Sequence, residues 1–418
     1  SYMVAHFHRD VVDSVPVTAM QTAGLLPELG AAGRSYIEMN RLIREKTGGI
    51  SVSVSSARNI KTGKYRLDFD VAGRCLPRNH GAMMDLMRDL ILAPELTHRN
   101  RIMELLNLQK AYAIPMAVAR GHRMASLAAT RCFSPLSWIQ HQTSGMEGIR
   151  FLIGLTPDSI DSVVQSIQSL LSGLCSLDQM SAGLTGSTRD MDDLTRRMGD
   201  FISQFPQSSV DLADMQQIES CDSPDPEAWV LSTDVSYVVK AIPAVFYEHA
   251  DSAHFAVLTA LMELPMYERI RAQGGAYGAF ATYDSTSALF QMMTFRDPHT
   301  AQSLESFDAV LKLMADGSFS DEKLKQAKIN IISRLDTPPS PREKGLIEFL
   351  RILNGITFED RRLYRTRLLN TTRDDIVRIV SDYLMNPRRS AIAMVTSDDI
   401  LNNEETKPLN LVRRTVES

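Results

Sequence analysis

The stretch Met266-Tyr-Glu-Arg-Ile-Arg-Ala-Gln-Gly-Gly-Ala-Tyr-Gly278 is the most informative part of this chain. Its pattern predicts a helix whose last turn carries Arg269 and Arg271, a stop at Gly274-Gly275, and a strand that opens at Tyr277. Glycine ends helices because it adopts left-handed backbone angles without a Cβ clash. We therefore expect the glycine pair to turn the chain so that a guanidinium and a phenol face one space.

These two side chains suit the recognition of peptide carbonyls. Arg271 donates planar, charged hydrogen bonds, and the Tyr277 hydroxyl can donate to a developing oxyanion. A simpler interpretation is structural: a helix C-cap with two arginines that offset the helix dipole, followed by an ordinary buried tyrosine. The motif by itself leaves both interpretations open, because no obvious nucleophile or metal site accompanies it.

Five further segments support a functional interpretation through their order along the chain. They are Gly121-His-Arg-Met-Ala125, Phe133-Ser-Pro135, Arg150-Phe-Leu152, Phe295-Arg-Asp-Pro298 and Asp336-Thr-Pro-Pro-Ser-Pro341. Together with Arg-x-x-Gly-Gly-Ala-Tyr-Gly they resemble the C-terminal half of the insulinase-type (pitrilysin) zinc peptidases, in particular the presequence-protease and falcilysin branch. The resemblance covers nearly the whole chain and is strongest from about Phe246 to Leu384.

The resemblance implies a partner and a set of roles. Full-length members of this branch form a clamshell of two homologous halves around a chamber, and a zinc-binding His-x-x-Glu-His lies in the N-terminal half. The C-terminal half supplies an arginine and a tyrosine that contact substrate near the scissile bond. In this chain those catalytic residues are expected to be Arg271 and Tyr277, with Gly274, Gly275 and Gly278 as the structural part of the motif.

The chain departs from the full-length pattern because no His-x-x-Glu-His occurs in its sequence. Glu248-His249 is the nearest approach, but Val245 stands where the first histidine is needed. A catalytic zinc takes about three protein ligands plus an open position. The resemblance thus implies zinc in the full-length enzyme and no metal ligands in this chain, which alone is expected to be inactive.

The expected partners follow from the same resemblance. They are an N-terminal zinc-bearing half, covalently attached or separate, and short unstructured peptides as substrates. An alternative is a non-catalytic insulinase-like subunit that acts as a scaffold or peptide-binding partner.

Composition agrees with an ordinary globular protein. The chain has 418 residues, 44% hydrophobic and 23% charged, which predicts two or three domains with ample cores. A net charge of −5 argues against a nucleic-acid partner, which requires a basic face. No apolar run reaches about 18 residues, so the sequence predicts no membrane span.

Four widely spaced cysteines form no Cys-x-x-Cys pair. Cys75, Cys132, Cys175 and Cys221 are expected to be buried free thiols in a reducing compartment, such as a bacterial cytoplasm or an organelle matrix, although disulfides remain possible.

The predicted fold class is α+β, with two homologous insulinase-type domains, each a mainly antiparallel sheet packed against helices. Residues 1–210 are predicted to form a presequence-protease-associated domain, because Pro, Ser, Asp and Gln dominate from about 204 onward. Residues 211–226 are expected to be a linker. Residues 227–418 form the expected C-terminal domain with the arginine–tyrosine motif.

Periodicity places the main elements of both domains. In the first domain we expect a strand at 11–19, a hairpin from 50 to 71 and a helix start at Thr156-Pro157. In the second we expect strands at 235–239, 277–283, 288–294 and 390–395, and helices that begin at Asp251, Ser320 and Thr372.

The remaining candidates are weaker. The closest groupings of histidines are His6-x-His8, on an end expected to be frayed, and His249 with His254, and neither spacing matches a metal-ligand pattern. His122 is expected to pack against a neighbouring element. Arg296 and Asp297 are expected to form a structural ion pair at a strand end, with a substrate role as the second possibility.

Overall fold

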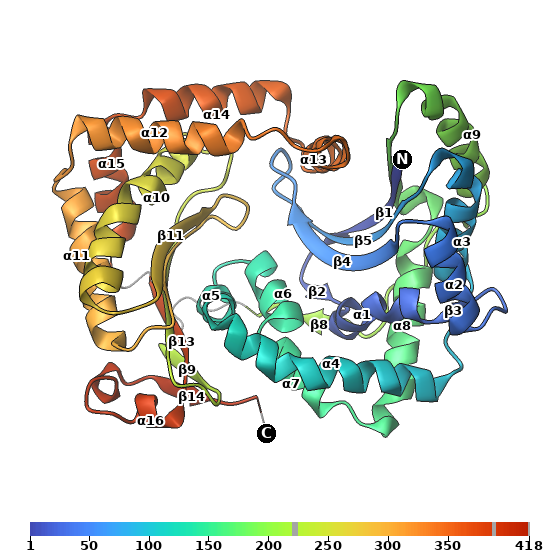
Figure 1. Cartoon of the computed structure of the whole chain (residues 1–418), viewed down its shortest axis with the longest axis horizontal. Helices are drawn as coiled ribbons and strands as arrows, with labels where there is room; N and C mark the ends of the chain where they lie inside the picture. Colours follow the sequence, from blue (N-terminus) through green and yellow to red (C-terminus); the bar gives the residue numbers. More distant parts are fainter. Residues whose placement is uncertain (220–224, 387–389, 417–418) are drawn as a thin grey trace. The chain divides into compact units, whose positions relative to one another are not determined.

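The computed structural model of the protein describes residues 1–219, 225–386 and 390–416 (Figure 1). It contains two compact units, each assembled from three stretches of sequence. Unit 1 comprises Ser1–Lys110, Gly154–Ile218 and Pro339–Gly355, and unit 2 comprises Ala111–Ile153, Glu219–Pro338 and Ile356–Ser418. The change between units after Ile218 falls inside the expected linker. The linear division into 1–210, 211–226 and 227–418 stays a prediction, and it does not include the exchanged segments 111–153 and 339–355.

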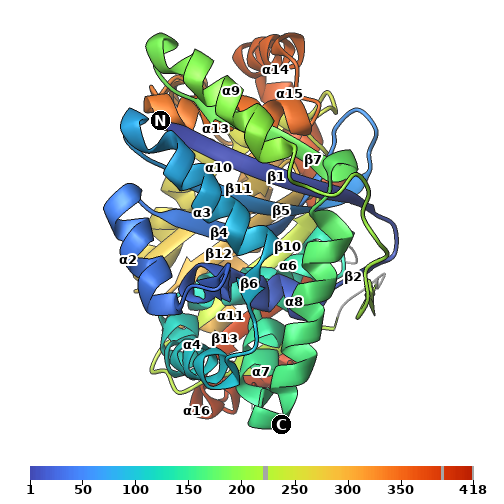
Figure 2. The same ribbon diagram turned by 90° about the vertical axis from the view of Figure 1, so that its right-hand side faces the viewer.

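Unit 1 contains a four-stranded antiparallel sheet. Its strands, in spatial order, are β4 (Ile50–Arg58), β5 (Tyr65–Arg74), β1 (Tyr2–Val11) and β7 (Met180–Thr185). Phe7 and Phe69 are fully buried on one face. Figure 2 shows this face covered by α3 (His80–Leu92), α8 (Ile160–Leu174) and α9 (Met191–Ile202).

The other face of this sheet is polar and carries α13 (Pro341–Leu353), a helix from far downstream in the sequence. A Cβ added at Gly345 would overlap Thr185, so the glycine lets α13 lie close to β7. On this face His6 is fully buried, its Nδ1 lies 2.8 Å from Asp70 Oδ1, and the Phe349 ring meets its imidazole edge-on.

The N-terminal part of the chain corrects two predictions. The first strand is Tyr2–Val11 rather than 11–19, and Val17–Thr22 is helix α1. His6 and His8 therefore lie in a strand paired on both sides, not on a frayed end. The prediction was wrong because β1 alternates apolar residues with histidines, and a pattern with polar residues on one covered face does not read as a buried strand.

Unit 2 contains a six-stranded sheet. Its strands, in spatial order, are β11 (Gly278–Asp284), β12 (Leu289–Phe295), β10 (Tyr237–Pro243), β13 (Ala391–Thr396), β9 (Glu227–Val230) and β14 (Val412–Arg414). All neighbours are antiparallel except that β9 is parallel to both β13 and β14. β11 is an edge strand, which places the end of the glycine motif at the border of the sheet.

Both faces of the unit 2 sheet are buried under helices (Figure 1). One face packs against α10 (Ser252–Met266), α11 (Thr300–Ala315), α12 (Asp321–Leu335) and α15 (Arg373–Ile379), around the buried side chains of Phe255, Phe290 and Phe307. The other face packs against α5 (Gly121–Thr130), around Tyr237, Val239 and Met293. The near-continuous burial of β10 follows from cover on both sides.

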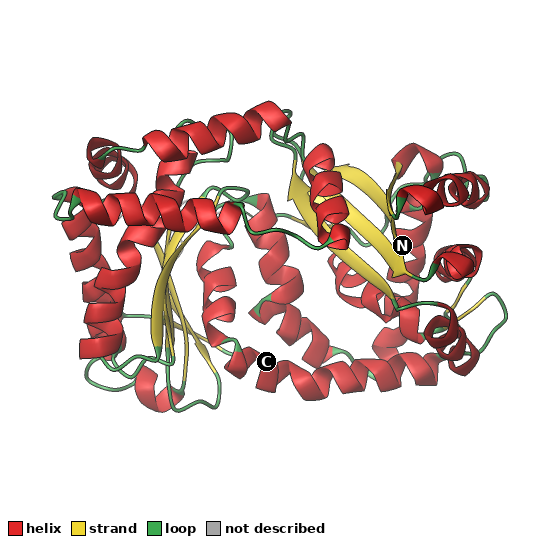
Figure 3. Ribbon diagram, turned by 45° about the horizontal axis from the view of Figure 1, so that its top comes forward, coloured by secondary structure: helices red, strands yellow, loops and turns green. Residues whose placement is uncertain are grey.

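The two units repeat one arrangement, shown by the two helix-flanked sheets of Figure 3. In each, a strand is followed by helix and then by a hairpin whose second strand pairs beside the first strand: β1 then β4–β5, and β10 then β11–β12. The predicted α+β class with two homologous domains of mainly antiparallel sheet and helices is confirmed.

Most predicted elements are confirmed, among them the hairpin β4–β5, the capped start at Thr156 and the helices that follow Asp251, Ser320 and Thr372. The other helices are α2 (Tyr36–Lys46), α4 (Arg99–Ala119), α6 (Pro135–Ser144), α7 (Met146–Gly154), α14 (Phe358–Asn370) and α16 (Asp398–Leu401). The short strands are β2 (Ser14–Val15), β3 (Gly30–Ala31), β6 (Pro94–Glu95) and β8 (Gln216–Gln217).

The cysteines differ from expectation at one position. Cys75 and Cys175 are buried free thiols, and burial raises the pKa of both. Cys132 is disulfide-bonded, so the expectation of a free thiol there was wrong. Cys221 lies outside the described residues. Within the described ranges, no helix has the length and apolarity needed to cross a membrane.

Candidate functional site

The helix that leads into the glycine corner changes its winding before it ends. α10 continues into a π-helical segment, η6 (Tyr267–Gln273), with Met266 and Ile270 buried beneath it. A π-helix closes its hydrogen bonds over five residues and is often found at functional sites. The predicted helix through Arg271 is confirmed, whereas its π-helical winding was not predicted, because propensity does not separate the two windings.

The two glycines of the corner are needed for different reasons. A Cβ at Gly274 would lie 2.8 Å from the Ile270 carbonyl oxygen, which is closer than real Cβ contacts allow. Gly275 has a φ of +76°, in the left-handed region that only glycine enters without strain. The Ala276 N–H then donates to the Ile270 carbonyl at 3.1 Å, which closes the turn. At Gly278 an added Cβ meets only Phe295 Cβ at 3.7 Å, so this glycine is not sterically required.

The corner brings Arg271 and Tyr277 together. The guanidinium carbon of Arg271 lies 5.5 Å from the ring centroid of Tyr277 and 5.5 Å from that of Tyr267. A cation over an aromatic face is stabilised by the ring quadrupole. The arginine is exposed and forms no ion pair with any residue that the structure describes. A cation held by two tyrosine rings, with no acidic partner, is available to bind a ligand oxygen.

Tyr277 is not the buried tyrosine of the purely structural interpretation, because 64% of its surface is exposed. Its ring meets the Phe295 ring at 5.8 Å and 60°, and its backbone N–H donates to the Arg296 carbonyl at 3.2 Å. The ring is thus positioned by its neighbours while the residue stays accessible. Arg269 makes no ring contact with Tyr277 in the described structure, as its place on the helix predicted.

The strand end opposite Tyr277 corrects another prediction. Arg296 and Asp297 form no ion pair within the described part of the chain. The Arg296 guanidinium lies 5.5 Å from the Phe295 ring instead, and its residue has a φ of +51°. Asp297 is buried, accepts a hydrogen bond from the His299 N–H at 3.0 Å, and has a pKa raised by burial. Adjacent residues at a strand end point to opposite sides, which separates the two charges.

His122 packs against neighbouring elements, as expected. Its imidazole lies 5.1 Å from the Phe295 ring and 5.9 Å from the Phe280 ring, and burial lowers its pKa. It therefore supports, through Phe295, the ring that contacts Tyr277. Tyr267 and Phe295 were not identified from the sequence; the four-residue spacing of Tyr267 and Arg271 on one helix was the available signal.

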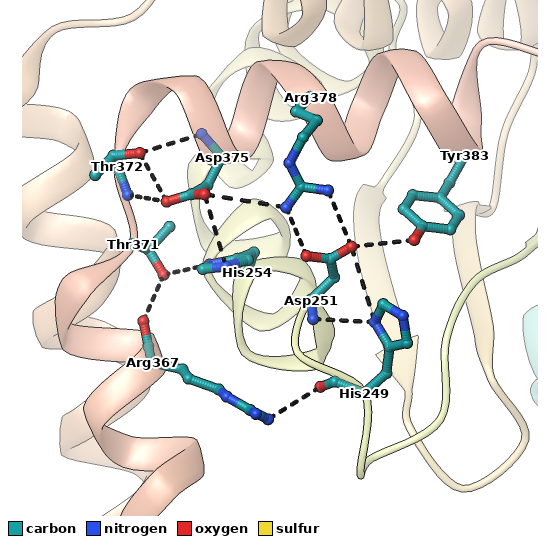
Figure 4. A network of polar contacts seen from close by, with 9 residues as sticks. All are labelled: His249, Asp251, His254, Arg367, Thr371, Thr372, Asp375, Arg378 and Tyr383. Atoms are coloured by element: carbon teal, nitrogen blue, oxygen red, sulfur yellow. Dashed lines mark hydrogen bonds and ion pairs between the residues drawn. The ribbon is translucent and has the colours of Figure 1, made fainter.

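The other two histidines belong to a hydrogen-bonded network at the start of α10 (Figure 4). The Asp251 carboxylate accepts from both terminal nitrogens of Arg378, at 3.0 and 2.5 Å, and from the Tyr383 hydroxyl at 3.0 Å. These hydrogen bonds, chiefly those from Arg378, lower the pKa of Asp251.

Both histidines of the network have oxygen or backbone partners. The His249 Nδ1 accepts from the Asp251 N–H at 3.1 Å, and the His254 Nδ1 lies 2.8 Å from the Thr371 hydroxyl oxygen. Among the described residues, no group of three or more His, Cys, Asp or Glu side chains is close enough to hold a metal ion. A metal site is thus not part of the corner that Arg271 and Tyr277 form.

Comparison with known proteins places this geometry in a family. The domain family associated with subfamily C of the M16 peptidases matches residues 22–155, and the family described as "PreP C-terminal domain" matches residues 226–398. A mitochondrial presequence protease of Eremothecium gossypii is 27% identical over 383 residues, which are 89% of this chain and 38% of that protein. The chain therefore spans about two-fifths of the length of that relative.

Two solved structures share the fold. The peptidase M16 inactive domain from Pseudomonas fluorescens is 11% identical, with a TM-score of 0.66 over 95% of this chain and 92% of that one. Pitrilysin is 13% identical, with a TM-score of 0.65 over 100% of this chain and 43% of that one. Sequence relatives, family matches and fold agree. The chain is the C-terminal half of a presequence-protease-like protein of the insulinase (M16) peptidase family.

Proposed function

We propose that this chain is the C-terminal half of a zinc-dependent oligopeptidase, that it closes a peptide-degrading chamber, and that it supplies residues that bind substrate and transition state. One observation carries the proposal. Arg271 and the exposed Tyr277 lie together at a glycine corner beside the edge strand β11, and no described acidic residue neutralises the guanidinium. Carbonyl oxygens of a peptide are the ligands that this pair fits.

The proposed roles follow from the chemistry of the two groups. Arg271 donates hydrogen bonds to a backbone carbonyl of the substrate and so positions the peptide. The Tyr277 hydroxyl donates to the oxyanion that develops when the scissile carbonyl becomes tetrahedral. Removal of one such donor costs roughly 3 kcal/mol in other enzymes. Tyr267 contacts the same guanidinium and restricts where it lies.

Zinc enters this proposal only through a part of the enzyme outside this chain. The sequence lacks His-x-x-Glu-His, and the described residues hold no cluster of three metal-ligating side chains. The residues present therefore do not fit a zinc site, and we assign no step of metal chemistry to them. The zinc-bearing N-terminal half, attached or separate, and short unstructured peptides are the proposed partners. By carry-over from the names of the matched relatives, the proposed compartment is an organelle matrix.

The test uses the chain joined to, or mixed with, a zinc-bearing N-terminal half. Tyr277→Phe keeps the ring over Arg271 and removes only the hydroxyl, so kcat for a quenched-fluorescence peptide should fall roughly tenfold or more with a modest change in KM. Tyr267→Phe is the matched control, because Tyr267 is also about half exposed and also contacts Arg271. Unchanged kcat in Tyr277→Phe, or an equal loss in both variants, would remove Tyr277 from the mechanism.

The missing zinc motif favours a second candidate, a non-catalytic subunit that acts as a scaffold or binds peptide. This function predicts no cleavage with any N-terminal half. Peptide cleavage assayed after mixing the chain with a zinc-bearing half separates the two candidates: activity that depends on both components supports the peptidase, and its absence supports the scaffold.

A further inference from the structure

Unit 1 contains a second glycine corner at the position equivalent to the one described above. Helix α2 ends in Gly48–Gly49 and leads into the edge strand β4, just as η6 ends in Gly274–Gly275 and leads into the edge strand β11. Gly49 has a φ of +117°, again in the left-handed region. An arginine lies at the end of the partner strand in both units, Arg74 at the end of β5 and Arg296 after β12.

The two corners differ in what stands opposite that arginine. In unit 2 the residue that donates its N–H to the Arg296 carbonyl, at 3.2 Å, is Tyr277. In unit 1 the residue that donates to the Arg74 carbonyl, at 2.7 Å, is Gly48. Unit 1 therefore has no side chain where unit 2 has a phenol.

A cavity of about 860 Å³ lies at this point in unit 1. It is lined by the end of α2, the glycine corner, the end of β5 and the start of α13. A smaller hollow of about 200 Å³ shares Gly48, Arg74 and Arg342 with it and continues beside the first residues of β4 and the last residues of β5. The two together have room for several residues of an extended peptide rather than for a single small ion.

The lining is strongly cationic. Its basic side chains are those of Arg44, Lys46, Arg74, Arg78 and Arg342, and its one acidic side chain, Glu45, accepts from Arg41 at 3.1 Å. None of the five basic residues forms an ion pair with another residue of the described chain. Five cations around one concave surface, without acidic partners, attract a negatively charged ligand.

Two of these arginines are held in place. The Arg74 Nε donates to the Gly48 carbonyl at 2.7 Å, and the Arg342 guanidinium lies 4.7 Å from the Tyr2 ring. A Cβ at Gly48 would lie 2.9 Å from Arg74 Nε, so the glycine makes room for this arrangement. A restrained guanidinium loses less side-chain entropy when it binds a carboxylate in a forked geometry.

We propose that this cleft is an anion-binding subsite that takes a carboxylate of an extended peptide, either its free C-terminus or an acidic side chain. The choice of a peptide rests on the proposed function, whereas the choice of an anion rests on the charges of the cleft. The subsite anchors the peptide through unit 1, independently of the arginine–tyrosine corner of unit 2.

The test measures fluorescence anisotropy of three N-terminally labelled decapeptides added to the whole chain at low ionic strength. The first has a neutral sequence and a free C-terminus, the second has the same sequence with a C-terminal amide, and the third is the amide with two internal glutamates. We expect the first or the third to bind at least about five-fold more tightly than the second, since exposed charge pairs each contribute modestly, and the preference should weaken in high salt. Which of the two binds identifies the source of the carboxylate.

Variants locate the binding. Arg44→Gln combined with Arg78→Gln should weaken the carboxylate peptide about five-fold or more, because neither side chain has a hydrogen bond to replace within the described chain. Arg123→Gln combined with Lys325→Gln is the matched control: both residues are exposed and lie in unit 2, and their substitution removes the same net charge. Circular dichroism checks that both double variants fold.

Two results would overturn the subsite: equal affinity for the amide and the two carboxylate peptides, or an equal loss in both double variants. This outcome is separate from that of the proposed function. If Tyr277→Phe leaves kcat unchanged while Arg44→Gln with Arg78→Gln abolishes the carboxylate preference, the subsite stands and the catalytic proposal fails.

Discussion

Two glycines three residues apart should respond in opposite ways to the same added methyl group. Gly275 has a φ of +76°, yet the nearest atom to an added Cβ is Pro298 Cγ at 3.7 Å, an ordinary contact. Gly278, the first residue of β11, has a similarly open environment, with Phe295 Cβ at 3.7 Å. An alanine at either position therefore meets no steric overlap, and the difference between the two isolates the cost of the left-handed backbone.

The expected magnitudes follow from that difference. Gly275→Ala forces a residue with a Cβ into left-handed angles and should destabilise unit 2 by about 1–2 kcal/mol. Gly278→Ala reduces only the freedom of the unfolded chain and should stabilise by roughly 0.4–1 kcal/mol. Because Gly275 also fixes where Tyr277 begins, Gly275→Ala should lower the kcat of the complete enzyme as well.

The assay is urea denaturation followed by tryptophan fluorescence. The chain has two tryptophans, Trp138 and Trp229, and both are buried in unit 2, so the signal reports this unit. The midpoints of the two variants should move in opposite directions while the slope m stays constant. Equal shifts, or a silent Gly275→Ala, would show that the corner relaxes and that glycine conformation does not hold Tyr277 in place.

Two further predictions concern the stability of unit 2. His141 is buried against Trp229, and burial, with Arg131 nearby, lowers its pKa from 6.5 to about 3. Because the unfolded state binds the proton more readily, stability is fully present above about pH 6.5 and falls below it. Between pH 7.5 and 5.0 the protein should lose about 2 kcal/mol that His141→Gln does not lose, whereas Gln at the exposed His98 should change nothing; parallel pH profiles would contradict this. Asp251→Asn weakens a buried partner of Arg378 and should cost about 2 kcal/mol in the same assay, against under about 1 for Asn at the surface residue Asp398, and similar losses would contradict the role of burial.

The local structure of the corner could be predicted from sequence because it depends on neighbours in the chain. A helix that meets Gly274-Gly275 must stop, since the first has no room for a Cβ and the second has left-handed angles. The same holds for the capped helix starts at Ser320 and Thr372, whose side chains accept from the N–H three residues on. In each case the deciding contact spans fewer than about five residues.

Features that depend on distant segments were not predictable in this way. His6 reads as part of a frayed end until β5, β7 and α13 are placed around it. The partners of Asp297 also come from elsewhere in the fold, because its backbone pairs with Ser236 rather than its side chain with Arg296. Sequence periodicity carries no record of which remote segment covers a face.

The sequence alone determined that a helix, a glycine stop and an edge strand bring one arginine and one tyrosine near each other, and its motif order predicted the peptidase family that the comparisons confirmed. Only the tertiary structure decided that Tyr277 stays exposed while Arg271 lies against two tyrosine rings, and that an equivalent corner in unit 1 is lined by cations. The physical reason is range: backbone conformation is set by residues next in the chain, whereas exposure, ring contacts and unpaired charge depend on which distant segments pack nearby.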